Sequence, residues 1–141
     1  MTTLDQDIRS QLQQRALTAT GFPADGSRAF EGMSFTPVAG EEWARLTILP
    51  LANDALLTGQ TNSMTGIFQI DLYWPVGAGT GAIEAATNNL KSVFRPATRL
   101  TLAGGEVLDI VNVERISGLP PEADFIRSTV QVRWRVHSTR L

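Results

Sequence analysis

Residues 125–136 alternate between apolar and polar side chains, and this pattern constrains the fold more than any other feature of the sequence. Successive side chains of a β-strand point to opposite faces of a sheet, so one set is predicted to be buried and the other to face outward. The apolar set is Ile126, Val130, Val132, Trp134 and Val136, and the polar set is Arg127, Thr129, Gln131, Arg133 and Arg135. We therefore expect a sheet that has one face against a core.

Two earlier segments, residues 43–49 and 67–74, alternate in the same way, and a proline follows each of them. We predict strands that end at Pro50 and Pro75, because proline cannot donate to the hydrogen-bond ladder of a sheet. Asp71 falls on the outward side of the second strand. An arginine across the sheet could pair with it there.

Two segments have the periodicity of amphipathic helices. In the first, Thr3 and Gln6 fit a capping box, and one face is apolar: Leu4, Ile8, Leu12 and Ala16. Pro23 blocks the continuation of this helix. The second helix is predicted over residues 82–94, with Thr80 as its N-cap.

Shorter strands are predicted at residues 100–102 and 106–116, where a Gly104-Gly105 turn joins them. Together, these elements predict an α+β fold: a mixed, mainly antiparallel sheet of about five strands, with two helices packed on one face. A length of 141 residues suits one domain, so we assign residues 1–141 to a single domain.

Two long loops are predicted, at residues 22–42 and 51–66, because turn-forming residues interrupt any regular period there. Long loops are uncommon in compact domains and are often functional. The first loop carries three phenylalanines: Phe22, Phe30 and Phe35. We interpret them as pins that fasten the loop to its own core, and the alternative is that they contact a partner.

The amino-acid composition excludes most kinds of catalytic and metal site. The chain has no cysteine, which excludes disulfides, thiol nucleophiles, iron–sulfur clusters and cysteine-based zinc sites. A single histidine excludes a metal site built from several histidines of one chain. No apolar run approaches the ~18 residues that a membrane span needs, and the first residues do not resemble a signal peptide. We expect no cofactor, no metal and no membrane attachment.

The motif most suggestive of chemistry is Gly77-x-Gly79-x-x-Ala82, between a predicted strand and a predicted helix. It fits a loose form of the dinucleotide-binding fingerprint, in which glycines let a pyrophosphate approach a helix N-terminus. However, Pro75 breaks the strand before it, and no acidic residue follows the next strand to bind a ribose. We interpret the motif as a helix-entry loop and expect no enzyme. The alternative is a small nucleotide-binding or transferase-like enzyme that uses the Gly77–Gly81 loop.

Charge is unevenly spread along the chain. Residues 1–90 carry nine acidic residues against four arginines (net −5), whereas residues 91–141 carry eight basic residues against five acidic ones (net +3). The basic part could meet an acidic protein surface or nucleic acid, or it could be a solvated face. A sequence pI near 5.3 argues against nucleic acid as the main partner.

The order of these segments resembles the tail terminator proteins of long-tailed bacteriophages, also called minor tail proteins. The resemblance covers most of the chain, and the combination of motifs is more specific than any one of them. The matching stretches are Phe35-Thr36-Pro37, Glu42-Trp43-Ala44-Arg45, the segment from Gly66 through Gln69 and Asp71 to Pro75, Gly77-Ala78-Gly79, and Val132-Arg133-Trp134-Arg135.

The resemblance implies a structural virion protein with an α+β fold. Family members are expected to form a six-membered ring on the completed tail tube, which ends polymerisation and offers a surface for joining the head. The implied partners are sister subunits, the tail tube protein and a head-completion or connector protein, with DNA passing through the lumen without sequence-specific binding. The implied location is the tail end at the neck of the virion, after assembly in the host cytoplasm.

Two surfaces are expected to make the contacts of such a ring. The outward face of the last strand, with Arg127, Arg133 and Arg135, is predicted to meet the next subunit or to line the lumen. The two long loops are second candidates, through Phe22, Phe30, Phe35, Asn53, Asp54 and Asn62. Two other functions stay open as alternatives to a tail terminator: another neck protein, such as a head-side stopper, and a free-standing binding module.

Overall fold

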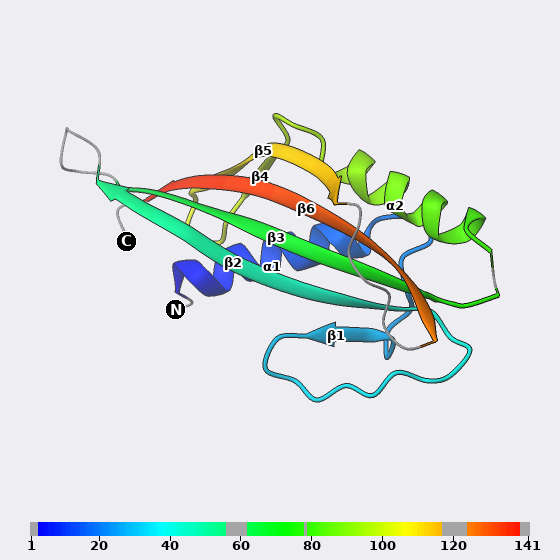
Figure 1. Cartoon of the computed structure of the whole chain (residues 1–141). Coiled ribbons are helices and arrows are strands. Elements are labelled where there is room, and N and C mark those ends of the chain that lie inside the picture. The colour runs from blue at the N-terminus through cyan, green and yellow to red at the C-terminus, as the bar shows by residue number, and fades with distance from the viewer. Residues whose placement is uncertain (1–2, 56–61, 78, 117–123, 139–141) are drawn as a thin grey trace.

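The computed structural model describes residues 3–55, 62–77, 79–116 and 124–138 of the chain. Its elements are α1 (Leu4–Leu17), β1 (Arg28–Phe30), β2 (Trp43–Ala55), β3 (Asn62–Pro75), α2 (Gly81–Val93), β4 (Arg99–Thr101), β5 (Val107–Ile116) and β6 (Phe125–Ser138) (Figure 1). The two predicted helices are present, and every predicted strand has a counterpart. The chain forms a single α+β domain, as the sequence predicts.

All strands join one six-stranded sheet in the order β1-β2-β3-β6-β5-β4. Neighbouring strands are antiparallel except β1 and β2, which run parallel, so the sheet is mixed and mainly antiparallel. The additional strand is β1, which lies inside the loop predicted at residues 22–42. Three residues are too few to show a period, so the sequence pattern could not reveal it.

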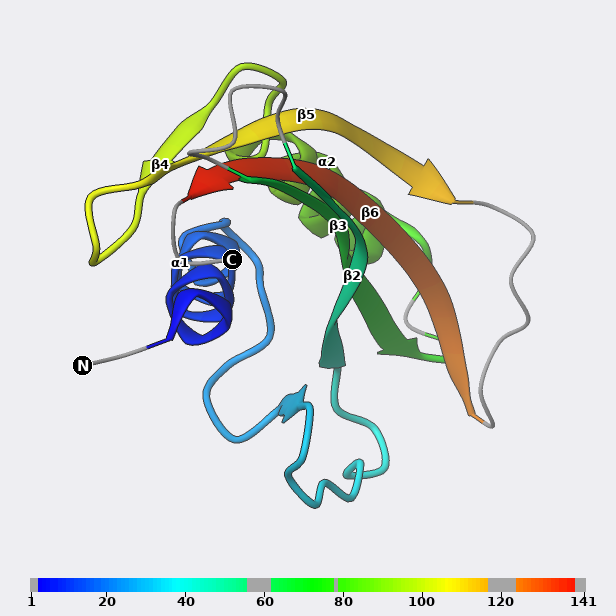
Figure 2. The same ribbon diagram turned by 90° about the vertical axis from the view of Figure 1, so that its left-hand side faces the viewer.

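The sheet curls around α1, as Figure 2 shows, and α2 packs on the same inner face. The predicted capping box is present: the side chains of Thr3 and Gln6 each accept a hydrogen bond from the other residue's backbone N–H. Thr80 is the N-cap residue of α2, but its side chain makes no capping hydrogen bond because its backbone is already helical. The predicted N-cap residue is therefore confirmed.

The prediction of a long loop at residues 51–66 is largely wrong. β2 continues to Ala55 and β3 begins at Asn62, so only residues 56–61 of that range fall outside the described chain. Asn53 pairs with Met64, Asp54 with Ser63, and Asn62 with both Ala55 and Ser138. The predicted contacts Asn53, Asp54 and Asn62 therefore lie in paired strands and not in a loop.

Pro50 does not end β2, contrary to the prediction. A register shift lies between Pro50 and Ala52, and β1 covers β2 only at residues 44–46. Proline is tolerated at a bulge and on an edge strand, because the missing N–H is not needed there. Pro50 meets both conditions, so the strand passes through it.

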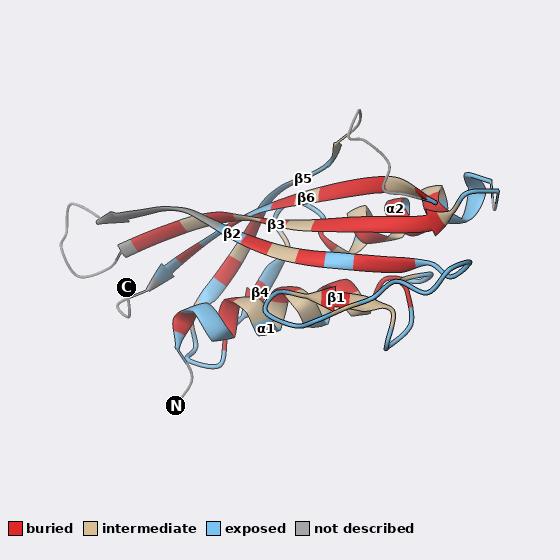
Figure 3. Cartoon of the chain, turned by 60° about the horizontal axis from the view of Figure 1, so that its bottom comes forward, coloured by how far each residue is buried: buried red, intermediate tan, exposed pale blue. Residues whose placement is uncertain are grey.

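The inner face of the sheet and the two helices form the main core. Buried positions alternate along β2, β3 and β6 and form a stripe on each helix (Figure 3). Gly66 lies directly opposite the buried ring of Trp134. A Cβ atom on Gly66 would lie 2.7 Å from Cε2 of Trp134 and 2.9 Å from the carbonyl oxygen of Leu49. The core thus requires glycine at position 66, because a larger residue would collide with Trp134 and Leu49. The backbone conformation there does not itself demand glycine.

A second, smaller cluster lies on the outer face of the sheet, the face opposite the helices. The rings of Trp43 and Tyr73 stack with centroids 4.1 Å apart, and Phe125 meets Trp43 edge-on at 6.0 Å. The sequence places Trp43 and Tyr73 on the outward side, but both are buried, because the loop after β1 covers them with Phe35. A side chain on the outer face at this end of the sheet can therefore be shielded from solvent.

The three phenylalanines of the 22–42 segment pack on the protein's own cores. Phe22 and Phe30 lie against the main core, and Phe35 lies against the outer cluster, 5.3 Å from Trp43. These contacts agree with the interpretation of the three side chains as pins.

Candidate functional site

The outer face of β3 and β6 carries a buried carboxylate. Asp71 is 2% exposed, and its Oδ1 accepts hydrogen bonds from Nη2 and Nε of Arg127 at 2.9 and 3.2 Å. The hydroxyl of Thr129 donates to the same oxygen at 2.5 Å. The predicted pairing of Asp71 with an arginine across the sheet is confirmed. A buried charge needs such partners, since an unpaired one would be strongly destabilising.

Two glutamines extend this network along the sheet. Nε2 of Gln69 donates to Asp71 at 3.2 Å, and Oε1 of Gln69 accepts from Nε2 of Gln131 at 3.0 Å. The register explains the arrangement, because Gln69 and Gln131 are direct cross-strand partners, as are Asp71 and Thr129. The centre of the outer face is therefore a ladder of satisfied polar groups that fixes the β3–β6 register.

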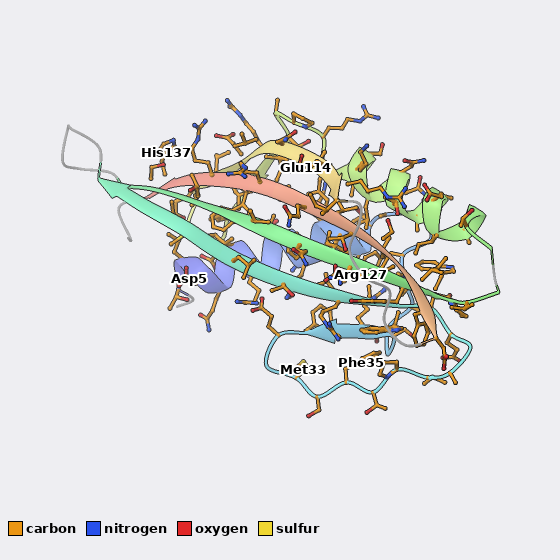
Figure 4. All side chains as sticks on the ribbon, viewed as in Figure 1. Asp5, Met33, Phe35, Glu114, Arg127 and His137 are labelled. Atoms are coloured by element: carbon orange, nitrogen blue, oxygen red, sulfur yellow. The ribbon has the colours of Figure 1, made fainter. Side chains whose placement is uncertain are left out.

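Arginines cover the aromatic cluster at one end of the ladder. The guanidinium of Arg127 lies 5.7 Å from the ring centroid of Tyr73, and that of Arg45 lies 5.1 Å from Trp43 and 5.8 Å from Tyr73. Figure 4 shows Arg127 over the sheet at this end. Its side chain is 19% exposed. Of the three arginines predicted at an interface or lumen, Arg127 thus has an internal structural role.

Arg133 and Arg135 lie further along β6 and are exposed. Arg133 pairs in register with Ile67 and Asn112, and Arg135 pairs with Thr65 and Asp109. Asp109 makes its ion pair with Arg99, with 3.2 Å between its Oδ1 and Nε of Arg99. Within the described part of the chain, no ion pair engages Arg133 or Arg135. These two cations are available to a partner.

Beside them, a bulge in β5 brings Glu114 to the outer face. The register shifts between Ile110 and Asn112, after which Asn112 faces Arg133 and Glu114 faces Gln131. The hollow between these side chains has a volume of about 10 Å³, which admits one water molecule at most. This part of the surface suits contact with another protein surface better than binding of a small substrate.

Backbone conformation explains the glycines of the Gly77–Gly81 loop. Gly77 and Gly79 have φ angles of 99° and 77°, in the left-handed region that favours glycine. In the first turn of α2, the carboxylate of Glu84 accepts a hydrogen bond from Arg115 of β5 at 2.5 Å. That hydrogen bond lowers the pKa of Glu84. Glu84 thus occupies the first turn of α2 as one partner of an ion pair with Arg115.

A groove of about 390 Å³ runs between the loop after β1 and the edge of β2. Its lining includes Met33, Phe35, Trp43, Arg45 and Glu31. Sequence reasoning missed Glu31. Its Oε1 accepts from Nη1 of Arg9 at 2.7 Å and from the backbone N–H of Ile48 at 2.6 Å. No local sequence pattern signals contacts that join residues so far apart in the chain.

The part of the chain that the structure describes contains no group of three or more His, Cys, Asp or Glu side chains that could hold a metal ion. Within the same residues, no helix is long and apolar enough to span a membrane.

The profile of the phage tail terminator protein family matches residues 7–134. The chain belongs to this family. Its role is therefore structural, it lies in the tail of the virion, and it interacts with tail components. The resemblance noted in the sequence is confirmed, and an enzyme built on the Gly77–Gly81 loop has no support from the family.

A solved structure shows the same fold as this tail terminator family member. It is 22% identical, with a TM-score of 0.64, and the alignment covers 97% of this chain and 96% of the other. At this identity the likeness establishes the fold alone. A search among curated proteins found no significant match.

Proposed function

We propose that this protein caps the phage tail tube as a ring of six identical subunits, ends tube polymerisation and provides the surface for joining the head. Membership of the tail terminator family carries the proposal. The outer face of β3 and β6 supports it, because Asp71, Thr129, Gln69 and Gln131 form a hydrogen-bonded polar platform there, next to exposed Arg133 and Arg135. Arginine is enriched at protein–protein interfaces, so this surface suits contact with another protein.

A ring built head to tail uses two different surfaces on each subunit, and these must be complementary. Residues 22–42 carry four acidic residues and one arginine, whereas residues 91–101 carry three basic residues and no acidic one. Internal ion pairs neutralise Glu31 and Arg99. Exposed Glu41 and Glu42 remain on the first segment, and exposed Arg95 remains on the second. The two segments flank opposite ends of the strand order, as a closed ring needs.

Arg133 and Arg135 are placed in this proposal at the subunit interface or on the lumen, through which DNA passes without sequence-specific binding. Their exposure and the lack of an ion pair with other described residues support this assignment. Arg127 contributes indirectly, because it holds the sheet surface next to them in place.

Electron microscopy of the purified protein at high concentration, and of the protein bound to isolated tail tubes, tests the proposal. We expect rings with six-fold symmetry and one ring at the head-proximal end of each tube. A protein that stays monomeric at every concentration and leaves tube ends bare would contradict it.

A further inference from the structure

The outer edge of β2 is closed to strand addition over residues 44–50. The backbone N–H groups of alternate residues face this edge. That of Ala44 donates to Ser27, and β1 covers residues 44–46. The N–H of Ile48 is taken by the carboxylate of Glu31, and Pro50 has no N–H to offer. Natural sheets protect their edges with such devices, so this side cannot extend by direct pairing of β2 over residues 44–50.

The outer edge of β5 is open over residues 111–116. The covering chain ends at Ile110, whose N–H donates to Thr98 and whose carbonyl accepts from Ala97. Beyond it, no described strand lies on the outer side of β5. Val111, next to the bulge, is 43% exposed. An open edge of this kind binds an extended segment through main-chain hydrogen bonds.

The loop that follows β1 offers an extended segment with uncovered apolar side chains. Residues 34–38 have no regular structure, and Met33 and Val38 are 69% and 58% exposed. In Figures 1 and 4 this loop lies at the bottom of the molecule, whereas β5 with Glu114 lies at the top. Acidic Glu41 and Glu42 follow the loop. Exposed Arg95 lies two residues before Ala97, whose N–H donates to the carbonyl of Ile110 where the open edge begins.

We propose that residues 33–38 of one subunit dock along the open β5 edge, residues 111–116, of the next subunit in the ring. The closure of β2 over residues 44–50 leaves this loop as an exposed segment that the β1 side can present, and its uncovered apolar side chains match exposed Val111 at the open edge. Glu41 and Glu42, beside the loop, can meet Arg95 of the next subunit. Pro37 takes a position whose N–H would point away from β5. The docked segment covers Met33, Val38 and Val111. This contact rests on the proposed ring and specifies which surfaces meet within it.

Disulfide trapping tests this contact cleanly, because the chain has no cysteine of its own. Single cysteines are placed at Met33, Thr36 or Val38 in one preparation and at Val111, Asn112 or Glu114 in the other. Pairs are mixed under conditions in which microscopy shows rings, and are then oxidised. Disulfides need Cα atoms within about 7 Å, so the scan also reports the register. Val76→Cys is the matched control, since this valine is 64% exposed but lies before α2.

We expect at least one loop–edge pair to give covalent dimers, and a chain that carries both cysteines of that pair to give a ladder of oligomers. Pairs that contain Val76→Cys should not cross-link. Rings without any loop–edge cross-link, or with equal cross-linking of the control, would overturn the docking contact while leaving the ring intact. Absence of rings under every condition would instead remove the proposed function and the contact together.

Discussion

The carboxylate of Asp71 accepts two hydrogen bonds from the guanidinium of Arg127, which lies 56 residues further along the chain. This pair joins the two central strands of the sheet on their outer face, where Thr129 and Gln69 complete the coordination of the carboxylate. It explains why a strongly acidic group can be buried on a face that the sequence pattern marks as outward.

Replacing Asp71 with Ala should lower the free energy of unfolding by about 2–3 kcal/mol, because Arg127 and Thr129 lose their acceptor. The effect is smaller than the ~3–5 kcal/mol typical of a fully buried pair, since Arg127 is partly exposed. Chemical denaturation measures it. Arg133→Ser is the control on the same strand and should stay within about 0.5 kcal/mol of the unchanged protein. Equal losses in the two variants would contradict the assigned role of Asp71.

Gly66→Ala should destabilise the fold by about 1–3 kcal/mol, because the added methyl group meets the ring of Trp134 and the carbonyl of Leu49. Thermal or denaturant unfolding measures the change. Gly81→Ala is the matched control: no atom lies within 4 Å of its Cβ position, and alanine favours the helix that begins there. A Gly66→Ala variant as stable as the control would show that the strands can separate to accommodate it.

Glu31→Ala should lower the free energy of unfolding by about 1–2 kcal/mol, since it leaves the N–H of Ile48 and the guanidinium of Arg9 without their shared acceptor. Glu31→Gln should recover part of this loss, because its amide oxygen can still accept from Ile48. Exposed Glu41→Ala is the control and should be nearly neutral. If Glu31→Ala were also neutral in denaturant melts, the closure of the β2 edge would not depend on Glu31.

The sequence predicts those structural features that depend on residues close together in the chain. The alternation through Val132, Arg133 and Trp134 is a property of consecutive residues, and the burial in β6 follows it. The capping box at Thr3 is equally local. Asp71 was correctly expected to pair with an arginine, because strand faces can be assigned from the same alternation.

The features that the sequence did not predict are tertiary. The sequence predicts that the strand ends at Pro50. Only the bulge after Pro50, and the end of β1 pairing at residue 46, show why β2 continues through it. Strand alternation places Trp43 and Tyr73 on the outer face of the sheet, and only the fold of the loop that carries Phe35 buries them there. The contacts of Glu31 span 22 residues to Arg9 and 17 to Ile48, so no window of the sequence contains them.

Replacing both Arg133 and Arg135 with Ser should weaken ring formation and head joining while changing the free energy of unfolding by less than about 1 kcal/mol. Both side chains are exposed and make no ion pair with other described residues, so their removal should affect partners and not the fold. Microscopy of rings and counts of joined particles measure the effect. Undiminished assembly by a folded double variant would remove these arginines from the interface.

The central claim is that this protein ends growth of the tail tube. It is tested most directly by measuring tail lengths, by electron microscopy, in lysates of a phage that lacks the protein, with and without the protein supplied in trans. The account predicts overlong tubes of variable length that fail to join heads, and a single normal length once the protein is restored. Tails of normal, uniform length in the absence of the protein would contradict it.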